Sequence, residues 1–450
     1  MRTCPGHSTT EPLLRRDLVE LIVVRERGSG LPRVLLIATV LVVAANLRPA
    51  ISAVGPLLEQ IRADTGLSPS LLGLLGAIPV ISFGVVSPFV HLLSSRWGLE
   101  RSICAALLLL AAGTVLRSLP APLLPGEESS AAQISLLTGT VTLSLGIGIG
   151  NVLVPAVVKR DFPDRVPLMT GLYTATMAGV AAAASGSAVP LSAAVGWEFA
   201  LGCTALLALI ACALWSTRLF WGGEAPQPPA PATAESATAE SATGETPSAT
   251  PSSAESAGAR APSMWRSPVA WQVTAYFALQ SGMFYLMLTW YPAILNYHGI
   301  GEAFAGWMLS LWQGVGIAAS LLVGPVLQRA RDQRAVSLLV CCTMTLTLLG
   351  ILFAPSWVIL WSVLGGFSTS TMLLLALTMI SLRARTAHQA GTLSGMAQGV
   401  GYLCAATGPL LAGAVFDLTG SWNPVLYGML AAVGLLAAAG LLAGRTVYTH

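Results

Sequence analysis

The chain has 450 residues, of which 54% are hydrophobic and 10% are charged, whereas a soluble domain carries about 25% charged residues. Its mean hydropathy is +0.72 and its formal net charge is +3. This composition excludes a soluble enzyme and a chain that is disordered throughout. It is typical of a membrane protein.

Twelve continuous apolar runs are long enough to cross a bilayer as helices, which takes about 20 residues each. The strands of a membrane barrel would instead alternate in polarity over about ten residues. The sequence therefore predicts an all-α, polytopic membrane protein with two bundles of six transmembrane helices. The predicted spans are 33–58, 70–93, 102–119, 132–157, 166–194, 197–220, 268–293, 303–327, 335–354, 357–382, 388–415 and 422–443.

The distribution of basic residues predicts an orientation. If the N-terminus lies in the cytoplasm, 20 of the 23 basic residues fall on the cytoplasmic side, as the positive-inside rule requires. Arg62 and Arg117 fall outside, and Arg48 lies inside the first span. Because 22 of the 23 basic residues are Arg, in a chain rich in Ala and Gly, a bacterial source is expected. We expect a multi-pass protein of the bacterial inner membrane with both termini in the cytoplasm.

Residues 222–266 differ from the rest of the chain. This segment is rich in Ala, Pro, Ser, Thr and Glu, repeats the tetrapeptide AESA, and has almost no large apolar residue. Because it cannot bury enough surface to fold, we interpret it as a disordered cytoplasmic linker; a binding role is the alternative. The predicted domains are an N-terminal tail 1–32, a first bundle 33–221, the linker 222–266, a second bundle 267–444 and a C-terminal tail 445–450.

The two halves of the chain also resemble each other. The connections after the second and eighth spans are both short and rich in Arg, and the fourth and tenth spans both end in basic residues before a Gly-rich span. Parallel repeats about an axis along the membrane normal are the architecture of secondary transporters of the major facilitator type. Neither the seven cysteines nor the five histidines form a cluster, so no zinc site, disulfide framework or other cofactor is expected.

A buried arginine is the most informative residue. The first span is centred near residue 46, which puts Arg48 only ~4 Å from the midplane at 1.5 Å per residue. A central Arg costs about 3 kcal/mol on insertion scales, and none of the 20 acidic residues lies near the centre of a span. We therefore predict that Arg48 faces a polar cavity, where its planar guanidinium suits flat anions. The alternative is an Arg that backbone carbonyls and water satisfy. The adjacent Pro49 supports a cavity, because it frees the carbonyl of Ala45.

Polar and aromatic residues in other spans should face inward, since their polar groups would be unsatisfied in lipid. Each could equally serve in hydrogen bonding between helices, but together around Arg48 they predict a binding site. Near the span ends, Trp290, Tyr291, Trp307 and Trp422 are interpreted as interfacial belt residues. The candidate substrate-binding residues are Arg48, Asn46, Asn151, Tyr173, Gln280, Phe284, Tyr285, Gln313, Gln398 and Tyr402.

Several strings in the sequence resemble a known family. NLRPAISAVGPLL, GNVLVPAVVKRDFP and LSGMAQGVGYLCAATGPLLAGAVFDLTGSW look like the cyanate and 2-nitroimidazole transporter branch of the major facilitator superfamily. The resemblance runs from about 33 to 444 and omits the tail and the linker. It implies alternating access around one central site, which here would include Arg48, Asn151 and Gln280 or Tyr285.

The sequence departs from the superfamily pattern in places. The usual G-x-x-x-D-R-x-G of the loop between the second and third spans reads HLLSSRWG from His91 to Gly98, so Arg96 and Arg101 must find other partners. The fifth span lacks the Gly-Pro motif of drug antiporters. No carboxylate lies in a span centre, so proton coupling stays open. The candidates for conformational gating are Pro49, Arg96, Arg101, Arg331, Asp332 and Arg334.

These observations predict a transporter of a small, planar anionic or nitro-type solute. The alternative within transport is multidrug efflux, which predicts a large apolar cavity and tolerance of Arg48→Ala. A polytopic membrane enzyme or sensor is disfavoured, because the short loops carry no cluster of His, Asp and Glu. The expected partners are a small solute and the lipid bilayer, with a coupling proton left open, no nucleic acid, and a monomeric protein.

Overall fold

The computed structural model describes residues 33–120, 128–221, 264–329, 332–384 and 387–445. Within these ranges all regular structure is helical, which confirms the predicted fold class. The predicted tail 1–32 and residues 222–263 of the predicted linker lie outside the described residues. The last three positions of that linker form the short helix η3 (Met264–Arg266).

The predicted spans agree with the observed helices to within a few residues at most ends. The first half contains α2 (Arg33–Asn46), α3 (Pro49–Ser52), α4 (Val54–Thr65), α5 (Pro69–Trp97), α6 (Leu99–Arg117), α7 (Glu128–Asp161), η2 (Pro163–Arg165), α8 (Val166–Val195), α9 (Trp197–Gly202) and α10 (Thr204–Trp221). The second half contains α11 (Pro268–Tyr297), α12 (Glu302–Arg329), α13 (Arg334–Phe353), η4 (Pro355–Trp357), α14 (Val358–Arg383), α15 (Ala387–Ala405), α16 (Thr407–Thr419) and α17 (Asn423–Ala443). Spans 1, 6 and 11 are therefore each interrupted.

Eleven of the described spans are long and apolar enough to cross a membrane. The helix outside that group is α11, which has 30 residues and is long enough to span. Its hydropathy is lowered by polar residues such as Gln272 and Gln280. A span with polar residues needs protein or water around it, and the buried positions of α11 cover most of its length.

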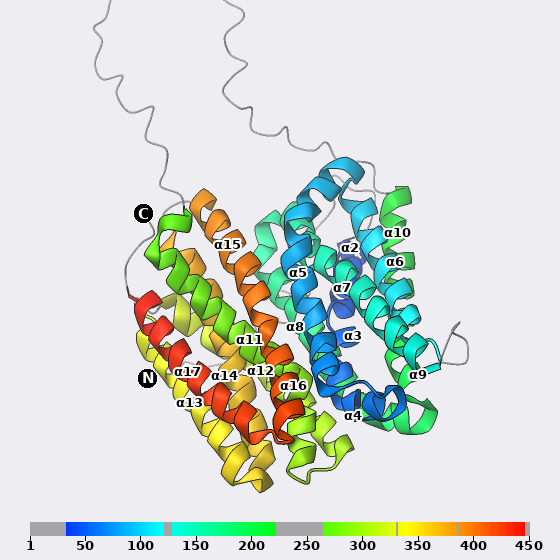
Figure 1. Ribbon diagram of the computed structural model, residues 1–450. Helices are drawn as coiled ribbons and strands as arrows, with labels where there is room; N and C mark the ends of the chain where they lie inside the picture. Colours follow the sequence, from blue (N-terminus) through cyan, green and yellow to red (C-terminus); the bar gives the residue numbers. More distant parts are fainter. Residues whose placement is uncertain (1–32, 121–127, 222–263, 330–331, 385–386, 446–450) are drawn as a thin grey trace, which may run out of the picture.

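The two halves meet at one end of the molecule, which we call the closed end (bottom of Figure 1). There, the first turns of α5 pack against α16, and the last part of α8 packs against the first part of α12. The backbone amide of Ser70 donates to a carboxylate oxygen of Asp417 at 2.8 Å. The side-chain amide of Gln60 donates to Glu302 at 3.2 Å. Both contacts join the first half to the second.

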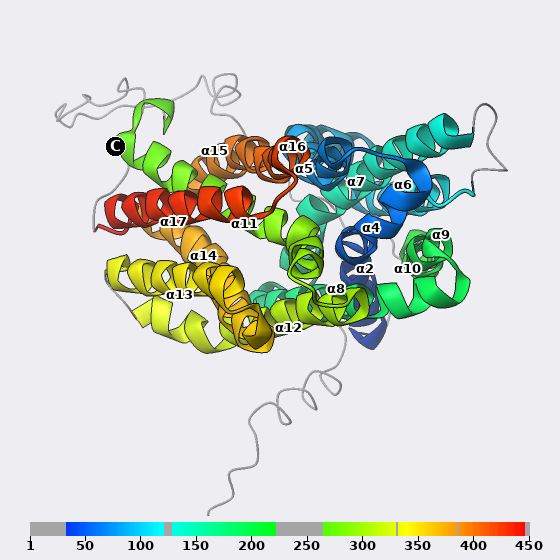
Figure 2. The same cartoon turned by 60° about the horizontal axis from the view of Figure 1, so that its bottom comes forward.

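The opposite end carries the arginine-rich connections, and three glycines near it have open space beside them. A Cβ added at Gly171 of α8, or at Gly391 or Gly395 of α15, would meet no atom within 4 Å. Figures 1 and 2 show the same two groups of helices, which approach each other around α4, α16 and α12. The hydrogen bonds of Gln60 and Ser70 that join the halves thus lie at the closed end.

The aromatic residues of the closed end are placed differently from the prediction. Trp290 is 2% exposed and Trp422 is 3% exposed, with their rings 4.8 Å apart, and Tyr291 is also buried. The interpretation of these three as interfacial belt residues was wrong. They fill the packing between helices of the second half, whereas Trp307 is exposed, as a belt residue would be.

The closed end depends on a glycine in α5. A Cβ at Gly73 would lie 2.5 Å from the carbonyl oxygen of Pro409, so no side chain fits while α5 and α16 are in contact. We expect Gly73→Ala to destabilise the closed end by about 1–3 kcal/mol through overpacking. In a cysteine-free background, spin labels at Ala63 and Leu418 should then report a longer distance between the halves.

Gly179→Ala is the matched control, because a Cβ there meets nothing within 4 Å. An unchanged distance in Gly73→Ala would show that α5 and α16 tolerate the extra atom.

Candidate functional site

The first span is broken where its charged residue lies. Helix α2 ends at Asn46 and α3 begins at Pro49. Arg48 stands between them as the N-cap of α3, with φ −130° and ψ −32°. Pro49 cannot donate a backbone hydrogen bond, which favours a break at this point. The irregular backbone that the sequence predicted beside Arg48 is therefore observed.

The guanidinium of Arg48 lies over an aromatic ring of the other half. Its Cζ is 5.1 Å from the centroid of Phe284, within the range of a cation–π interaction. Arg48 and Phe284 are both half-buried. Arg48 comes from the junction of α2 and α3, and Phe284 from α11. The contact thus joins the two halves at the centre of the protein.

Four further aromatic rings are linked to Phe284 through successive edge-on contacts. Tyr285 stands edge-on to Phe284 at 5.2 Å and to Tyr402 of α15 at 6.4 Å. Tyr402 also packs edge-on against Phe277 at 5.3 Å and against Phe83 of α5 at 6.1 Å. We call Phe83, Phe277, Phe284, Tyr285 and Tyr402 the aromatic cluster. It provides flat apolar surfaces, and its two phenol hydroxyls make no hydrogen bond to another described residue.

Within the described ranges Arg48 makes no ion pair. The salt bridges found there involve arginines near helix ends, and the described acidic residues lie away from the centres of the spans. Tyr285 and Tyr402 are close enough to Arg48 for an electrostatic interaction. A guanidinium stacked on a ring keeps its N–H edges available. The site can therefore hold a small flat solute that accepts hydrogen bonds.

Other predicted site residues use their polar groups within the protein. The side-chain amide of Asn46 donates to the carbonyls of Val42 and Leu207, at 2.8 and 3.3 Å, and this side chain is 2% exposed. We therefore leave Asn46 out of the site that we propose. Gln280 donates to Ser281 at 2.6 Å.

Gln398 donates to Ser394 at 2.7 Å, within the same helix, one turn from Tyr402. Asn151 of α7 is exposed and Tyr173 of α8 is half-buried. Neither makes a hydrogen bond to another described residue. They remain predictions as substrate-binding residues.

Gln313 occupies a different position from the one expected. Its side chain is 8% exposed and bridges the two halves. The hydroxyl of Ser52 donates to Gln313 Oε1 at 3.1 Å, and Gln313 Nε2 donates to the hydroxyl of Ser185 at 2.9 Å. Both serines belong to the first half and Gln313 to α12. The amide is thus engaged in a junction between halves.

A second arginine is buried at a span end. Arg117, predicted to lie on the outer side of the membrane, ends α6 and is 2% exposed. One guanidinium nitrogen, Nη1, donates to the carbonyl of Ala50 at 2.7 Å. Nε and Nη2 have no hydrogen-bond partner among the described residues, and Arg117 helps to line a cavity of about 10 Å³. This is about the space that one water molecule needs. Hydropathy places Arg117 at the end of its span, but it does not show whether the side chain is exposed or buried in the bundle.

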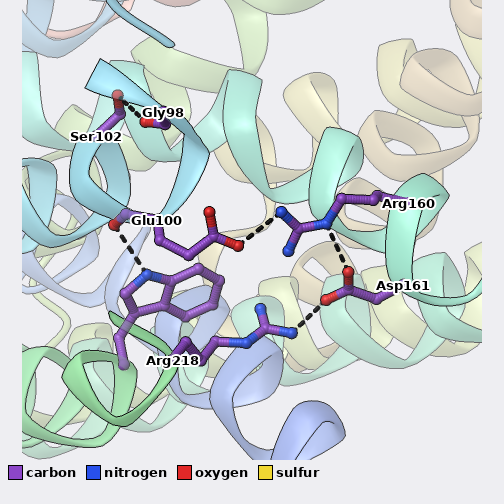
Figure 3. A network of polar contacts seen from close by, with 7 residues as sticks. Gly98, Glu100, Ser102, Arg160, Asp161 and Arg218 are labelled. Atoms are coloured by element: carbon purple, nitrogen blue, oxygen red, sulfur yellow. Dashed lines mark hydrogen bonds and ion pairs between the residues drawn. The ribbon is translucent and has the colours of Figure 1, made fainter. Parts of the chain in front are cut away.

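At the arginine-rich end, a charged network joins three helices of the first half (Figure 3). Arg160 binds Glu100 at 2.6 Å and Asp161 at 2.7 Å. Arg218 of α10 pairs with the same Asp161 and stacks on Trp215 at 4.5 Å. The carboxylates of this network are Glu100 and Asp161. Neither occupies the Asp position of the superfamily pattern in the loop between the second and third spans, where this chain has Ser95.

The second half has a corresponding arrangement. Arg383, at the end of α14, is 3% exposed. It donates to Gln333 Oε1 at 2.6 Å and to the carbonyl of Ala443 at 2.8 Å. In each half the end of the fourth span thus connects to the start of the third and the end of the sixth, which supports the predicted repeat.

The predicted gating residues that are described make no hydrogen bond or ion pair between the halves. Arg96 and Arg101 are exposed and make no described ion pair. Asp332 accepts a hydrogen bond from the backbone amide of Arg334 at 2.9 Å and lies 3.8 Å from its Nε. Arg331 lies outside the described residues. The gating assignments, that of Pro49 included, remain predictions; Pro49 is buried at the break of the first span.

Sequence reasoning missed several residues of the site. Phe83 and Phe277 lie in apolar spans, and Ser185 lies in a run of small residues, so none gave a signal. Ser52 did give one, because it lies one helical turn after Arg48 on the same face. The contacts that matter lie between residues far apart in the sequence.

The fold and the site define a membrane transporter, and the comparisons give its family. Residues 40–409 match the Major Facilitator Superfamily, so the chain belongs to this family. It is 38% identical over 402 residues to the 2-nitroimidazole transporter of Escherichia coli (strain K12), covering 89% of this chain and 93% of that one. It is 27% identical to the cyanate transport protein CynX of the same organism, covering 86% and 91%.

Solved structures of the same fold have low sequence identity. A bacterial homologue of the human lysosomal transporter Spinster, in an inward-facing and occupied conformation, aligns with a TM-score of 0.69 at 13% identity, covering 91% of this chain and 96% of that one. The inward-open xylose transporter XylE of E. coli aligns with a TM-score of 0.66 at 12% identity, covering 93% and 96%. These likenesses establish the fold.

The network in Figure 3 makes a stability prediction. The Arg218 side chain is 4% exposed and that of Asp161 is 11% exposed, so Asp161→Asn leaves a buried charge uncompensated. We expect a loss of about 3–5 kcal/mol in the free energy of unfolding. Arg160→Ala is the matched control, since the Arg160 side chain is 41% exposed and such pairs contribute less than about 1 kcal/mol. Thermal unfolding in detergent measures both, and an equal loss in the two variants would contradict the distinction.

Proposed function

We propose that this protein transports a small, planar anionic or nitro-type solute across the bacterial inner membrane by alternating access. The observation that carries the proposal is Arg48, a half-buried guanidinium on the ring of Phe284 with no described ion pair. The charge attracts the solute, and the aromatic cluster supplies flat surfaces for it. The names of the two E. coli relatives, which mention 2-nitroimidazole and cyanate, support the same class of solute.

In this proposal the arginine-rich end faces the cytoplasm, because basic residues accumulate there. The structure then corresponds to an inward-facing state, with the closed end toward the outside. Arg48 and Phe284 lie on opposite halves, so rocking of the halves would separate them and release the solute. We propose that the two halves that rock are the six-helix bundles formed by residues 33–221 and 267–444.

The role of Arg48 is tested by ligand binding. Thermal shifts of purified protein with cyanate, benzoate and 2-nitroimidazole report binding to the folded state. We expect Arg48→Ala to lower affinity by about 10- to 100-fold, because hydrogen bonds to a charged group contribute about 1.5–3 kcal/mol. Arg48→Lys should recover only part of the affinity, since an ammonium lacks the planar fork. Uptake into proteoliposomes should fall in the same order.

Equal binding by wild type and Arg48→Ala would overturn the proposed function. Shifts by bulky lipophilic cations, unchanged in Arg48→Ala, would instead favour multidrug efflux. Full affinity in Arg48→Lys would support a role for the positive charge but contradict recognition by the planar guanidinium.

The tyrosine hydroxyls provide a separate prediction. Tyr402→Phe removes a hydroxyl with no described partner, so we expect about 3- to 10-fold weaker binding of benzoate with an unchanged melting temperature. In the control, Tyr291→Phe, the lost hydroxyl is bound to Ser362 at 2.7 Å, so stability should fall by about 1 kcal/mol and affinity should not change. The reverse pattern would remove Tyr402 from the site.

A further inference from the structure

Helix α3 is a single turn that carries the site arginine. It runs from Pro49 to Ser52, with Arg48 as its N-cap. The carbonyl of Arg48 accepts hydrogen bonds from the amides of Ile51 and Ser52, both at 3.0 Å. Arg48 and Ser52 are therefore tied together, and a movement of one displaces the other.

Side chains hold α3 from both sides. Within the first half, Arg117 donates to the carbonyl of Ala50. From the second half, Gln313 accepts from the hydroxyl of Ser52. Leu47 and Arg48 separate α3 from α2, whereas Ala53, with φ −73° and ψ −18°, continues the helical backbone from α3 into α4. The two side-chain bonds therefore link this turn of span 1 to both halves.

The bond to Gln313 belongs to a buried relay across the halves. Ser52 and Ser185 are both 0% exposed, and each binds one end of the Gln313 amide. Ser185 in turn donates to the carbonyls of Ala181 and Ala182, at 3.1 and 3.0 Å. A buried polar group without a partner is costly, so the relay is complete only when α12 lies against α3 and α8. The hydrogen bond of Ser52, one helical turn from Arg48, therefore depends on the contact between the halves.

We propose that Gln313 is a positioning residue that acts through Ser52 to orient Arg48, so that closure of the halves and solute binding stabilise each other. The inference rests on the proposed function of Arg48. By linkage, the solute then favours closure as much as closure favours the solute. Gln313 itself does not touch the solute in this mechanism.

The test is a double-mutant cycle on Ser52 and Gln313. Benzoate affinity is measured by calorimetry for wild type, Ser52→Ala, Gln313→Ala and the double variant. We expect each single variant to bind about 10-fold more weakly and the double variant to bind no more weakly than either single one, because both changes break the same relay. Ser52→Thr, which keeps the hydroxyl, should restore the affinity of wild type.

Thr369→Val provides the matched control. Trp312, the neighbour of Gln313, donates its indole N–H to Thr369 at 3.0 Å, and Thr369 is 2% exposed. This bond is also buried and also involves α12, but it stays within the second half. We expect Thr369→Val to lower the melting temperature and leave benzoate affinity unchanged.

A conformational measurement separates positioning from stability. With spin labels at Ala63 and Leu418, benzoate should narrow the distance distribution across the closed end in wild type and in Thr369→Val. It should not do so in Ser52→Ala or Gln313→Ala. A stability role alone would not abolish this response.

The inference is overturned if Ser52→Ala and Gln313→Ala bind benzoate as wild type does, if their effects add, or if Thr369→Val weakens binding equally. These results remain distinct from failure of the proposed function. That failure would appear as undiminished binding in Arg48→Ala, whereas lost binding in Arg48→Ala with intact binding in Gln313→Ala rejects the positioning role alone.

Discussion

A positive charge near the middle of the first span determines how the rest of this protein is arranged. Arg48 has no described ion pair, and its guanidinium lies on the face of Phe284. A charge at this depth is costly in lipid, so the surrounding helices must provide a protein environment for it. The break before Pro49, the aromatic cluster and the polar residues of α11 are all parts of that environment. They come from both halves, so the charge lies at the interface between the halves.

The polar contacts divide into two groups with different consequences. Within each half, arginines at the arginine-rich end tie helix ends together, through Asp161 in the first half and through Gln333 in the second. Between the halves, the described hydrogen bonds lie near the closed end or around Gln313. Each half is thus held as a unit while few polar bonds join the two. This is the condition under which bundles can rock as rigid bodies.

Sequence reasoning located the spans well and the site partly. Hydropathy gave helix ends close to those of α5, α8 and α17, because a bilayer demands about 20 apolar residues in a row. It also identified Arg48 and the polar character of α11. It did not show that Arg117 is buried and donates to the carbonyl of Ala50, and it treated Trp290 and Trp422 as belt residues although they are buried. These errors share a cause, since the position of a residue along a span does not state which neighbour it meets.

The sequence by itself determined the class of protein, the number of spans and the central arginine, because these follow from local composition and from the cost of a charge in lipid. Only the tertiary structure decided which side chains share the centre with that arginine. Residues more than 200 positions apart meet there, such as Ser52 and Gln313. Their contact depends on how the two six-helix bundles pack. The pattern of apolar residues identifies each span separately, and it does not show how the spans pack against one another.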